Sequence, residues 1–290
     1  MKYFHFLFFL FTISLSAQIK GVVKDSITGK PIPYVNIWVQ NENIGSTTEE
    51  NGEFTINTSD KNKKIIFSAL GFEKKTIKAS EAVLVYLQPV EYQLEEVFIS
   101  KRIESKQIEI GKTKNSTYQA FENGPRIDTK FFPYLEHYKK TKYIKKVSIF
   151  IDNKLDDASV KIHFYKVDKN GFPEEELLKK DFIVSVKSGV KKHLINVSDF
   201  NLTMPKNGIF VGFEKLIIEK NKLEKTIFDP NSNTTKITTT YFPLLLYNRV
   251  EREFLFSFSG GKWNKNPNNT SDSKKKMSVN EPAITLILTN

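Results

Sequence analysis

Hydrophobic and polar residues alternate along most of the chain. In the N-terminal third, Val35, Ile37 and Val39 fall on one face of a predicted strand, with Asn36 and Trp38 on the other. This period of two is typical of a half-buried β-strand. Further segments with the same period are residues 53–57, 65–69 and 83–87. The pattern predicts short β-strands in this region rather than helices.

The intervals between these strands carry turn-forming residues. Thr28-Gly29 permits a positive φ, and Pro31 and Pro33 hold the approach to the next strand extended. Asn51-Gly52 is a strong signal for a β-hairpin. Six or seven short strands in about 70 residues predict a two-sheet sandwich with a modest core. We expect a sandwich of this size to depend partly on its neighbour for stability.

The order of these motifs resembles that of a known family. The segments that carry the resemblance are Gly21–Asp25, Thr28–Pro33, Val35–Val39 and Gly45–Phe54. They resemble the carboxypeptidase regulatory-like domain, a transthyretin-like (prealbumin-like) β-sandwich common in envelope proteins of Bacteroidetes-type bacteria. The resemblance covers roughly residues 18–90 and implies a non-catalytic domain. The family often has aspartate where Glu49 stands.

The C-terminal two thirds of the chain also contain β signals. Predicted strands there are residues 146–151, 160–167, 182–186, 209–213, 254–258 and 284–288. Their spacing fits an antiparallel sandwich of jelly-roll type. Residues 162–200 are similar to a β-sandwich module appended to regulatory-like domains in uncharacterised Bacteroidetes proteins. We therefore predict an all-β protein with two β-sandwich domains, residues 18–90 and 116–290, joined by a linker over residues 91–115.

The N-terminus has the features of a secretory signal. Lys2 is followed by an apolar run from Phe4 to Leu15, and Ala17 offers a small residue for cleavage before Gln18. The apolar run is shorter than the roughly 20 residues that span a membrane. Residues 1–17 are therefore predicted to be a signal peptide, and an uncleaved anchor is the alternative. Export would place the protein in the periplasm, on the outer membrane or at the cell surface.

Cysteine content and charge narrow the expected chemistry. The sequence has no cysteine, which excludes disulfides, thiolate metal sites, cysteine nucleophiles and acylation as a lipoprotein. It has 44 Lys and Arg residues against 33 Asp and Glu residues. The basic residues are spread in short groups, so we read them as a solvated surface. We expect no nucleic acid as partner, because an exported chain meets glycans and anionic lipid instead.

Residues 93–100 are similar to the segment that follows this domain in TonB-dependent outer-membrane receptors. About 190 residues follow Ser100, and a barrel of 22 strands with about 10 residues each needs more once loops and a plug are added. We therefore interpret residues 93–100 as an edge strand or a linker.

Enzyme signatures are weak in this sequence. A zinc carboxypeptidase needs a glutamate three residues after a histidine, but Lys140, Lys166 and Asn196 follow His137, His163 and His193 at that distance. We expect His163 to be solvated, because it shares a strand face with Lys161 and Tyr165, and we expect His137 to pack among aromatic residues.

Residues 258–261 are predicted to form a Gly-rich turn. The neighbouring carboxylates at 156–157 and 174–176 are predicted to lie in loops. No catalytic residue and no cofactor are predicted. Calcium ligation by Asp152, Asp156 and Asp157 stays open, with a surface loop favoured.

One residue is a binding candidate. Trp263 lies in the polar run 260–269, where an exposed indole would suit stacking on a sugar ring. The alternative is that Trp263 folds back over the end of the sandwich. Trp38 is expected to cover a sheet face, and Lys274–Lys276 to form a solvated loop.

The leading functional hypothesis is a non-catalytic envelope protein. In this hypothesis the regulatory-like domain is a docking or spacer module, and the second sandwich binds another envelope protein. Two alternatives are a carbohydrate-binding protein that uses loops of the second sandwich, and an unrecognised hydrolase. The first hypothesis predicts an apolar patch or an unpaired edge strand, and the second predicts an exposed Trp263. The expected partners are an envelope protein or a surface glycan, and peripheral association with the outer membrane is left open.

Overall fold

A computed structural model describes residues 18–90, 104–113, 118–121, 124–230, 233–266 and 277–290. The expected signal peptide and the segment 93–100 lie outside these ranges. The described residues form strands and short 3-10 helices, so the all-β prediction is confirmed. The 3-10 helices are η1 (Ala79–Glu81), η2 (Glu136–Lys140), η3 (Ser198–Phe200) and η4 (Glu219–Asn221).

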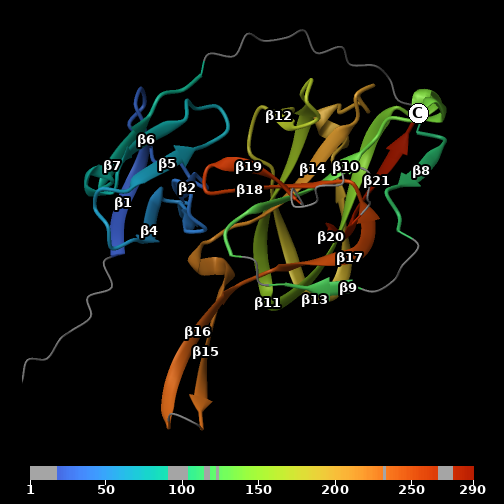
Figure 1. The fold of residues 1–290 in the computed structure, drawn as a ribbon. Helices are drawn as coiled ribbons and strands as arrows, with labels where there is room; N and C mark the ends of the chain where they lie inside the picture. The colour runs from blue at the N-terminus through green and yellow to red at the C-terminus, as the bar shows by residue number, and fades with distance from the viewer. Residues whose placement is uncertain (1–17, 91–103, 114–117, 122–123, 231–232, 267–276) are drawn as a thin grey trace, which may run out of the picture.

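The N-terminal domain is a sandwich of two sheets (Figure 1). The first sheet has the order β4 (Glu53–Asn57), β1 (Gln18–Asp25), β7 (Leu84–Leu87). The second has the order β3 (Gly45–Thr47), β2 (Asn36–Val39), β5 (Lys64–Ser68), β6 (Lys75–Lys78). Alternate residues of these strands, among them Val23, Ile37 and Phe54, close the core between the sheets. The alternation therefore predicted the buried face correctly.

The turn at Asn51-Gly52 is present, but it does not close a hairpin. Gly52 has a positive φ of 78°, and its N–H donates to Glu49 O at 2.9 Å. The strands on either side, β3 and β4, belong to different sheets, and β4 pairs with β1 instead. The turn thus carries the chain from one layer of the sandwich to the other.

The C-terminal domain is built on a 12-stranded sheet. Its main path is β19 (Lys262–Asn266), β18 (Leu255–Ser259), β10 (Ile127–Phe132), β14 (Ile209–Lys215), β11 (Tyr143–Val167), β17 (Leu244–Arg252) and β20 (Met277–Pro282). Strands off this path are β8 (Gln107–Ile110), β9 (Tyr118–Ala120), β12 (Pro173–Glu176), β13 (Ile183–Asn196) and β21 (Ile284–Thr289). The C-terminal strand predicted at 284–288 is therefore present. Within the range expected as linker, residues 107–110 form β8, which pairs with β21.

Strand β11 is the central element, and it corrects the sequence interpretation. We expected two strands separated by an acidic loop, but residues 143–167 form one strand of 25 residues. A register shift against β13 lies between Asn153 and Asp157. The buried Asn153 side chain holds this irregularity, because its amide group donates to Leu155 O at 2.9 Å and to Val186 O at 3.1 Å. An irregularity of this kind lets one strand bend without ending.

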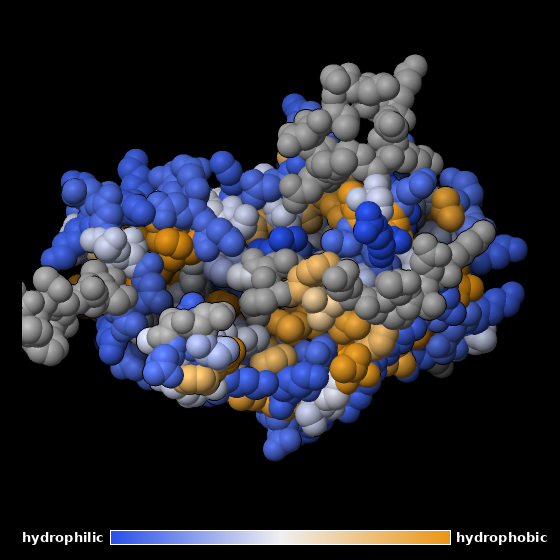
Figure 2. All heavy atoms as spheres, turned by 60° about the horizontal axis from the view of Figure 1, so that its bottom comes forward, coloured by the Kyte–Doolittle hydropathy of each residue, from blue (hydrophilic) through white to orange (hydrophobic). Residues whose placement is uncertain are grey.

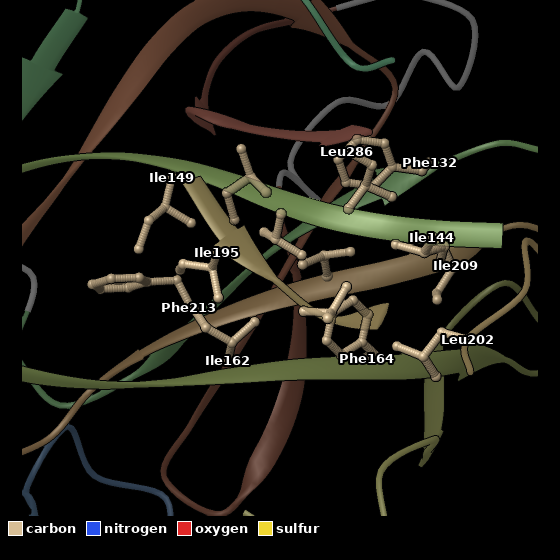
Figure 3. Close-up of a cluster of buried hydrophobic side chains, with 14 of the residues drawn as sticks. Phe132, Ile144, Ile149, Ile162, Phe164, Ile195, Leu202, Ile209, Phe213 and Leu286 are labelled. Carbon is tan, nitrogen blue, oxygen red and sulfur yellow. The ribbon is translucent and has the colours of Figure 1, made fainter. Parts of the chain in front are cut away.

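The bend places both halves of β11 around one core. Ile149 and Ile151 are fully buried before the irregularity, and Val160, Ile162 and Phe164 are buried after it. The same hydrophobic cluster contains Val147, Ile149 and Ile151 from before the shift and Val160, Ile162 and Phe164 from after it. Figure 3 shows Ile149, Ile162 and Phe164 in this core, together with Ile209 and Phe213 of β14.

One element stands apart from both domains. Strands β15 (Lys222–Asp229) and β16 (Thr234–Tyr241) form a separate two-stranded sheet. In Figure 1 this hairpin projects away from the rest of the molecule. It follows η4, which lies next to the N-terminal domain, and it leads back into β17.

Candidate functional site

A cavity of about 260 Å³ lies where the two domains meet. The N-terminal domain contributes Asn36, residues 68–70 and Lys74 to its wall. The C-terminal domain contributes Asp181 and residues of β10, β11, β12, β18 and β19. Four ionisable side chains at its wall, Lys161, His163, Glu176 and Asp181, lie close together. A charged cluster in such a position must be paired to be stable, since charges removed from water are otherwise costly.

His163 occupies the centre of this cluster. Its Nδ1 lies 2.8 Å from Glu176 Oε2, and its Nε2 lies 2.7 Å from Glu214 Oε2. Burial by itself opposes the charge on the ring, but the hydrogen bonds to these two carboxylates outweigh it and raise the pKa of His163 to about 9. The ring is therefore an imidazolium at neutral pH, and both of its N–H groups donate to carboxylates.

Lys161 is the second buried cation of the cluster. Its side chain is 2% exposed, and its Nζ lies 3.2 Å from Asp181 Oδ2. The same ammonium donates to the backbone oxygen of Tyr34, in the N-terminal domain, at 2.8 Å. Burial disfavours the charge on Lys161, but the carboxylates of Glu214 and Asp181 outweigh burial and raise its pKa. This cation thus joins the two domains directly.

Other polar bonds cross the same boundary. The Asn36 side chain donates to Glu214 Oε2 at 3.2 Å. At the η4 end of the boundary, the backbone N–H of Glu219 donates to Glu49 Oε1 at 2.8 Å. The longer side chain at the position where the family often has aspartate therefore bonds to the second domain. Nearby, the N–H of Ile217 donates to Thr47 Oγ1 at 3.1 Å.

Trp38 adds an apolar contact to this boundary. It is 3% exposed, and its ring meets Phe258 edge-on with centroids 5.8 Å apart. The alternation in the sequence placed Trp38 on the outer face of its sheet. In the structure the second domain covers this face. This contact is one that the expected dependence of the small sandwich on its neighbour would use, and the dependence itself stays a prediction.

The expectation that His163 is solvated is wrong. The face that it shares with Lys161 and Tyr165 is covered, and all three side chains are buried. Since both ring nitrogens bond to carboxylates, this histidine has no free nitrogen with which to accept a proton from a nucleophile at neutral pH. The charged cluster around His163 and Lys161 holds charged groups of the second domain against polar groups of the first domain.

Trp263 lies in strand β19, in the β18–β19 hairpin, where a long polar loop was expected. Its ring is half-buried and meets Tyr165 and Phe258 edge-on, with centroid distances of 5.0 and 5.2 Å. Trp263 also lines the cavity between the domains. The structure thus has the tryptophan folded back on the sandwich, which was the alternative to an exposed stacking platform.

The other residues singled out in the sequence are scattered. His137 is exposed and contacts the Tyr138 ring, and His193 is half-buried with a pKa that burial lowers. Asp152 and Asp157 lie within β11, where they pair with Lys154 and with Lys187 and Lys220 respectively. The turn expected at residues 258–261 is present, with positive φ at both glycines. Lys274–Lys276 lie outside the described residues.

Glu176, Glu214 and Asp181 were not recognised as site residues from the sequence. They lie 13, 51 and 20 positions from His163 or Lys161 in the chain, so no local motif links them. One signal was available. Glu214 is a charged residue at the end of the otherwise apolar run 209–213, and a charge on such a strand implies a buried partner.

No group of three or more His, Asp or Glu side chains among the described residues is arranged to hold a metal ion. None of the helices described is long and apolar enough to cross a lipid bilayer.

The β15–β16 hairpin carries three exposed apolar side chains. Ile227, Phe228 and Ile237 are 52%, 56% and 65% exposed. The pairs Thr226–Ile237 and Phe228–Thr235 are neighbours in the ladder, so Phe228 and Ile237 lie diagonally on one face. Figure 2, turned so that the bottom of Figure 1 comes forward, shows hydrophobic residues gathered in patches among hydrophilic ones. Neither outer edge of this hairpin pairs with another described strand.

Comparison with known proteins places the N-terminal domain in a family. Residues 19–99 match the family model of the CarboxypepD_reg-like domain. The chain is also 32% identical over 100 residues to a TonB-dependent receptor of Formosa agariphila. This match covers 31% of the chain and 10% of the receptor, so it spans about a tenth of the relative's length. The expected regulatory-like domain is therefore confirmed, and its family is non-catalytic.

Proposed function

We propose that this chain is an exported, non-catalytic protein of the bacterial envelope that binds another envelope protein. In this proposal the CarboxypepD_reg-like domain is a docking or spacer module that is fixed to the second sandwich. The second sandwich contacts the partner. The similarity to a TonB-dependent receptor and the signal-like N-terminus support an envelope location.

The observation that carries the proposal is the exposed β15–β16 hairpin. Every described side chain from residue 224 to 239 in it is exposed. An isolated two-stranded hairpin is marginally stable in water, because it buries too little surface. Ile227, Phe228 and Ile237 would be protected from water by a partner, and the free strand edges would gain hydrogen bonds by strand addition.

The charged boundary between the domains supports the same proposal. A hairpin that is attached next to η4 keeps its orientation relative to the N-terminal domain only if the boundary is rigid. Lys161, Glu214 and Glu49 supply bonds across that boundary. The two domains would then present one combined surface to a partner.

The test uses the absence of native cysteines. Single cysteines are introduced at Thr235 on the hairpin, at Thr55 on the exposed face of the first domain and at Ser188 in β13. Each variant carries a short thiol-linked photo-crosslinker and is activated in intact cells that express the full chain. The proposal predicts that Thr235→Cys captures one discrete envelope protein and that Ser188→Cys does not.

The Thr55→Cys variant distinguishes docking from spacing by the first domain. Capture of a protein there indicates docking, and no capture indicates a spacer. A hairpin cysteine that captures nothing, or the same mixture as Ser188→Cys, contradicts the proposed protein contact. Recovery of the chain from the cytoplasmic fraction contradicts export.

A further inference from the structure

A second cavity, of about 480 Å³, lies in the C-terminal domain away from the domain boundary. Its wall is formed by β10, by the turn between β17 and β18, and by the end of β8. The volume falls in the range of roughly 300–1,000 Å³ that is usual for small-molecule sites. No residue that the proposed function uses belongs to it.

The floor of this cavity is aromatic. Phe131 of β10 is the ladder partner of Phe210 in β14, and their rings are 5.0 Å apart. Phe254, just before β18, lies 6.3 Å from Phe131. Phe131 and Phe254 are partly exposed, whereas Phe210 and Phe256 below them are buried. Lys265 Nζ lies over the Phe254 ring, 5.0 Å from its centroid. The apolar surface offered to a ligand that carries C–H groups is therefore the Phe131 ring and the part of the Phe254 ring that Lys265 does not cover.

One wall of the cavity holds a positioned arginine. Arg252 Nε and Nη2 donate to the two carboxylate oxygens of Glu281 at 2.6 and 3.1 Å. Glu281 is itself buried against Lys130, with 3.0 Å between the charged atoms. Arg252 Nη1 donates to the backbone oxygen of Glu251 at 3.0 Å. A guanidinium held by a bidentate pair has a fixed plane, so the remaining N–H groups of Nη1 and Nη2 are oriented in advance.

Acceptors lie beside these donors. The carboxylates of Glu251 and Glu253 line the cavity and are exposed, and neither has a partner among the described side chains. The charged residues of the lining are balanced between Lys112, Lys130 and Arg252 on one side and Glu251, Glu253 and Glu281 on the other. The lining residues therefore carry no net formal charge, and Lys265 adds one positive charge beside the Phe254 ring.

We propose that this cavity binds a neutral oligosaccharide. Phe131 and Phe254 would pack against the C–H face of the sugar, and Arg252 and Glu251 would bond its hydroxyl groups. A polyhydroxylated ligand can bond to both the arginine donors and the glutamate acceptors of the cavity while it packs on the apolar floor. A simple anion would not bond to the glutamates. This site is distinct from Trp263 and goes beyond the proposed protein contact.

The test is isothermal titration of the mature chain with neutral trisaccharides. The probes are maltotriose, cellotriose, xylotriose, mannotriose and galactotriose, with trigalacturonate as a charged comparison. Two variants probe the site, Arg252→Lys and Phe254→Ala. Arg252→Lys keeps the charge beside Glu281 but removes the fixed fork. The matched controls are Arg249→Lys, in the same strand but outside the cavity, and Phe228→Ala on the hairpin.

At least one neutral trisaccharide is expected to bind, and both cavity variants should weaken it by about tenfold or more, which corresponds to about 1.4 kcal/mol. The two control variants should bind as the unchanged chain does. The proposal is overturned if no neutral trisaccharide binds, if trigalacturonate binds more tightly, or if the controls weaken binding as much as the cavity variants. Since the protein contact is tested at the hairpin, either proposal can fail without the other.

Discussion

The Nε2 atom of His163 lies 2.7 Å from an oxygen of Glu214, and the same oxygen accepts a hydrogen bond from Asn36 at 3.2 Å. One carboxylate therefore binds an imidazolium of the second domain and an amide of the first. A charge that is buried at such a point is stabilising only while every partner is in place. We therefore expect the attachment of the domains to depend in part on the protonation of His163.

The first prediction concerns pH. The folded pKa of His163, about 9, is above its ordinary value of 6.5. The stability that this shift provides is fully present below pH 6.5, and it is lost as the pH rises through about 9. The difference is on the order of 3 kcal/mol. Thermal unfolding between pH 6 and 10 should show this loss in the unchanged chain.

The control for this prediction is His163→Asn. This variant should be less stable at neutral pH, by about 3 kcal/mol, because the buried Glu214 and the partly buried Glu176 lose a partner. It should also lack the loss of stability between pH 7 and 9. An unchanged chain whose stability is flat over that range would show that His163 is not held as an imidazolium.

A second prediction concerns Glu49. Replacement by aspartate shortens the side chain, so the hydrogen bond from the N–H of Glu219 should be lost. We expect Glu49→Asp to lower the free energy of unfolding by about 1 kcal/mol. The matched control is Glu53→Asp, at an exposed position of β4. Equal effects of the two substitutions on denaturant unfolding would argue against a role of Glu49 between the domains.

A third prediction concerns Trp263. Because its ring packs edge-on against Tyr165 and Phe258, Trp263→Ala should lower stability by about 2 kcal/mol. Trp263→Phe should retain most of that stability. In a Trp38→Phe background the remaining indole should be partly shielded from acrylamide. Full quenching, together with unchanged stability of Trp263→Ala, would indicate an exposed platform instead.

A fourth prediction separates the hairpin from the body of the protein. Phe228→Ser and Ile237→Ser remove exposed apolar groups that make no core contact. We expect each to change the free energy of unfolding by less than about 0.5 kcal/mol. A loss of several kcal/mol in chemical denaturation would mean that the hairpin packs on the body and is not a free surface.

Local sequence patterns predicted the strands β2, β4, β5 and β7 and several turns of the N-terminal domain. Its strands follow from alternation, and its turns from residues such as Gly29 and Gly52, which have φ of 68° and 78°. These are short-range effects, so neighbouring residues in the chain contain the needed information. The pairing of the strands on either side of a turn was less predictable. The Asn51-Gly52 turn predicted a β3–β4 hairpin, but β4 pairs with β1.

The site could not be predicted in the same way. Lys161 and His163 look solvated, because they alternate with apolar residues on a strand whose outer face is normally wet. Their burial depends on a second domain, and their partners Asp181 and Glu214 are distant in the chain. Asn153 likewise reads as a loop residue, yet its side-chain bonds keep β11 continuous. In each case a tertiary contact, and not the local sequence, determines whether the residue is buried or lies in a strand.

The most direct test of the proposed function is the recovery of the chain in a defined complex. The unchanged chain and a Phe228→Ser/Ile237→Ser variant are expressed at equal levels, crosslinked in intact cells and purified from the envelope. The proposal predicts that the unchanged chain is recovered with one envelope protein in constant ratio, and that the variant loses this protein while it stays folded. Equal recovery of the same protein with both chains would contradict a contact through the hairpin.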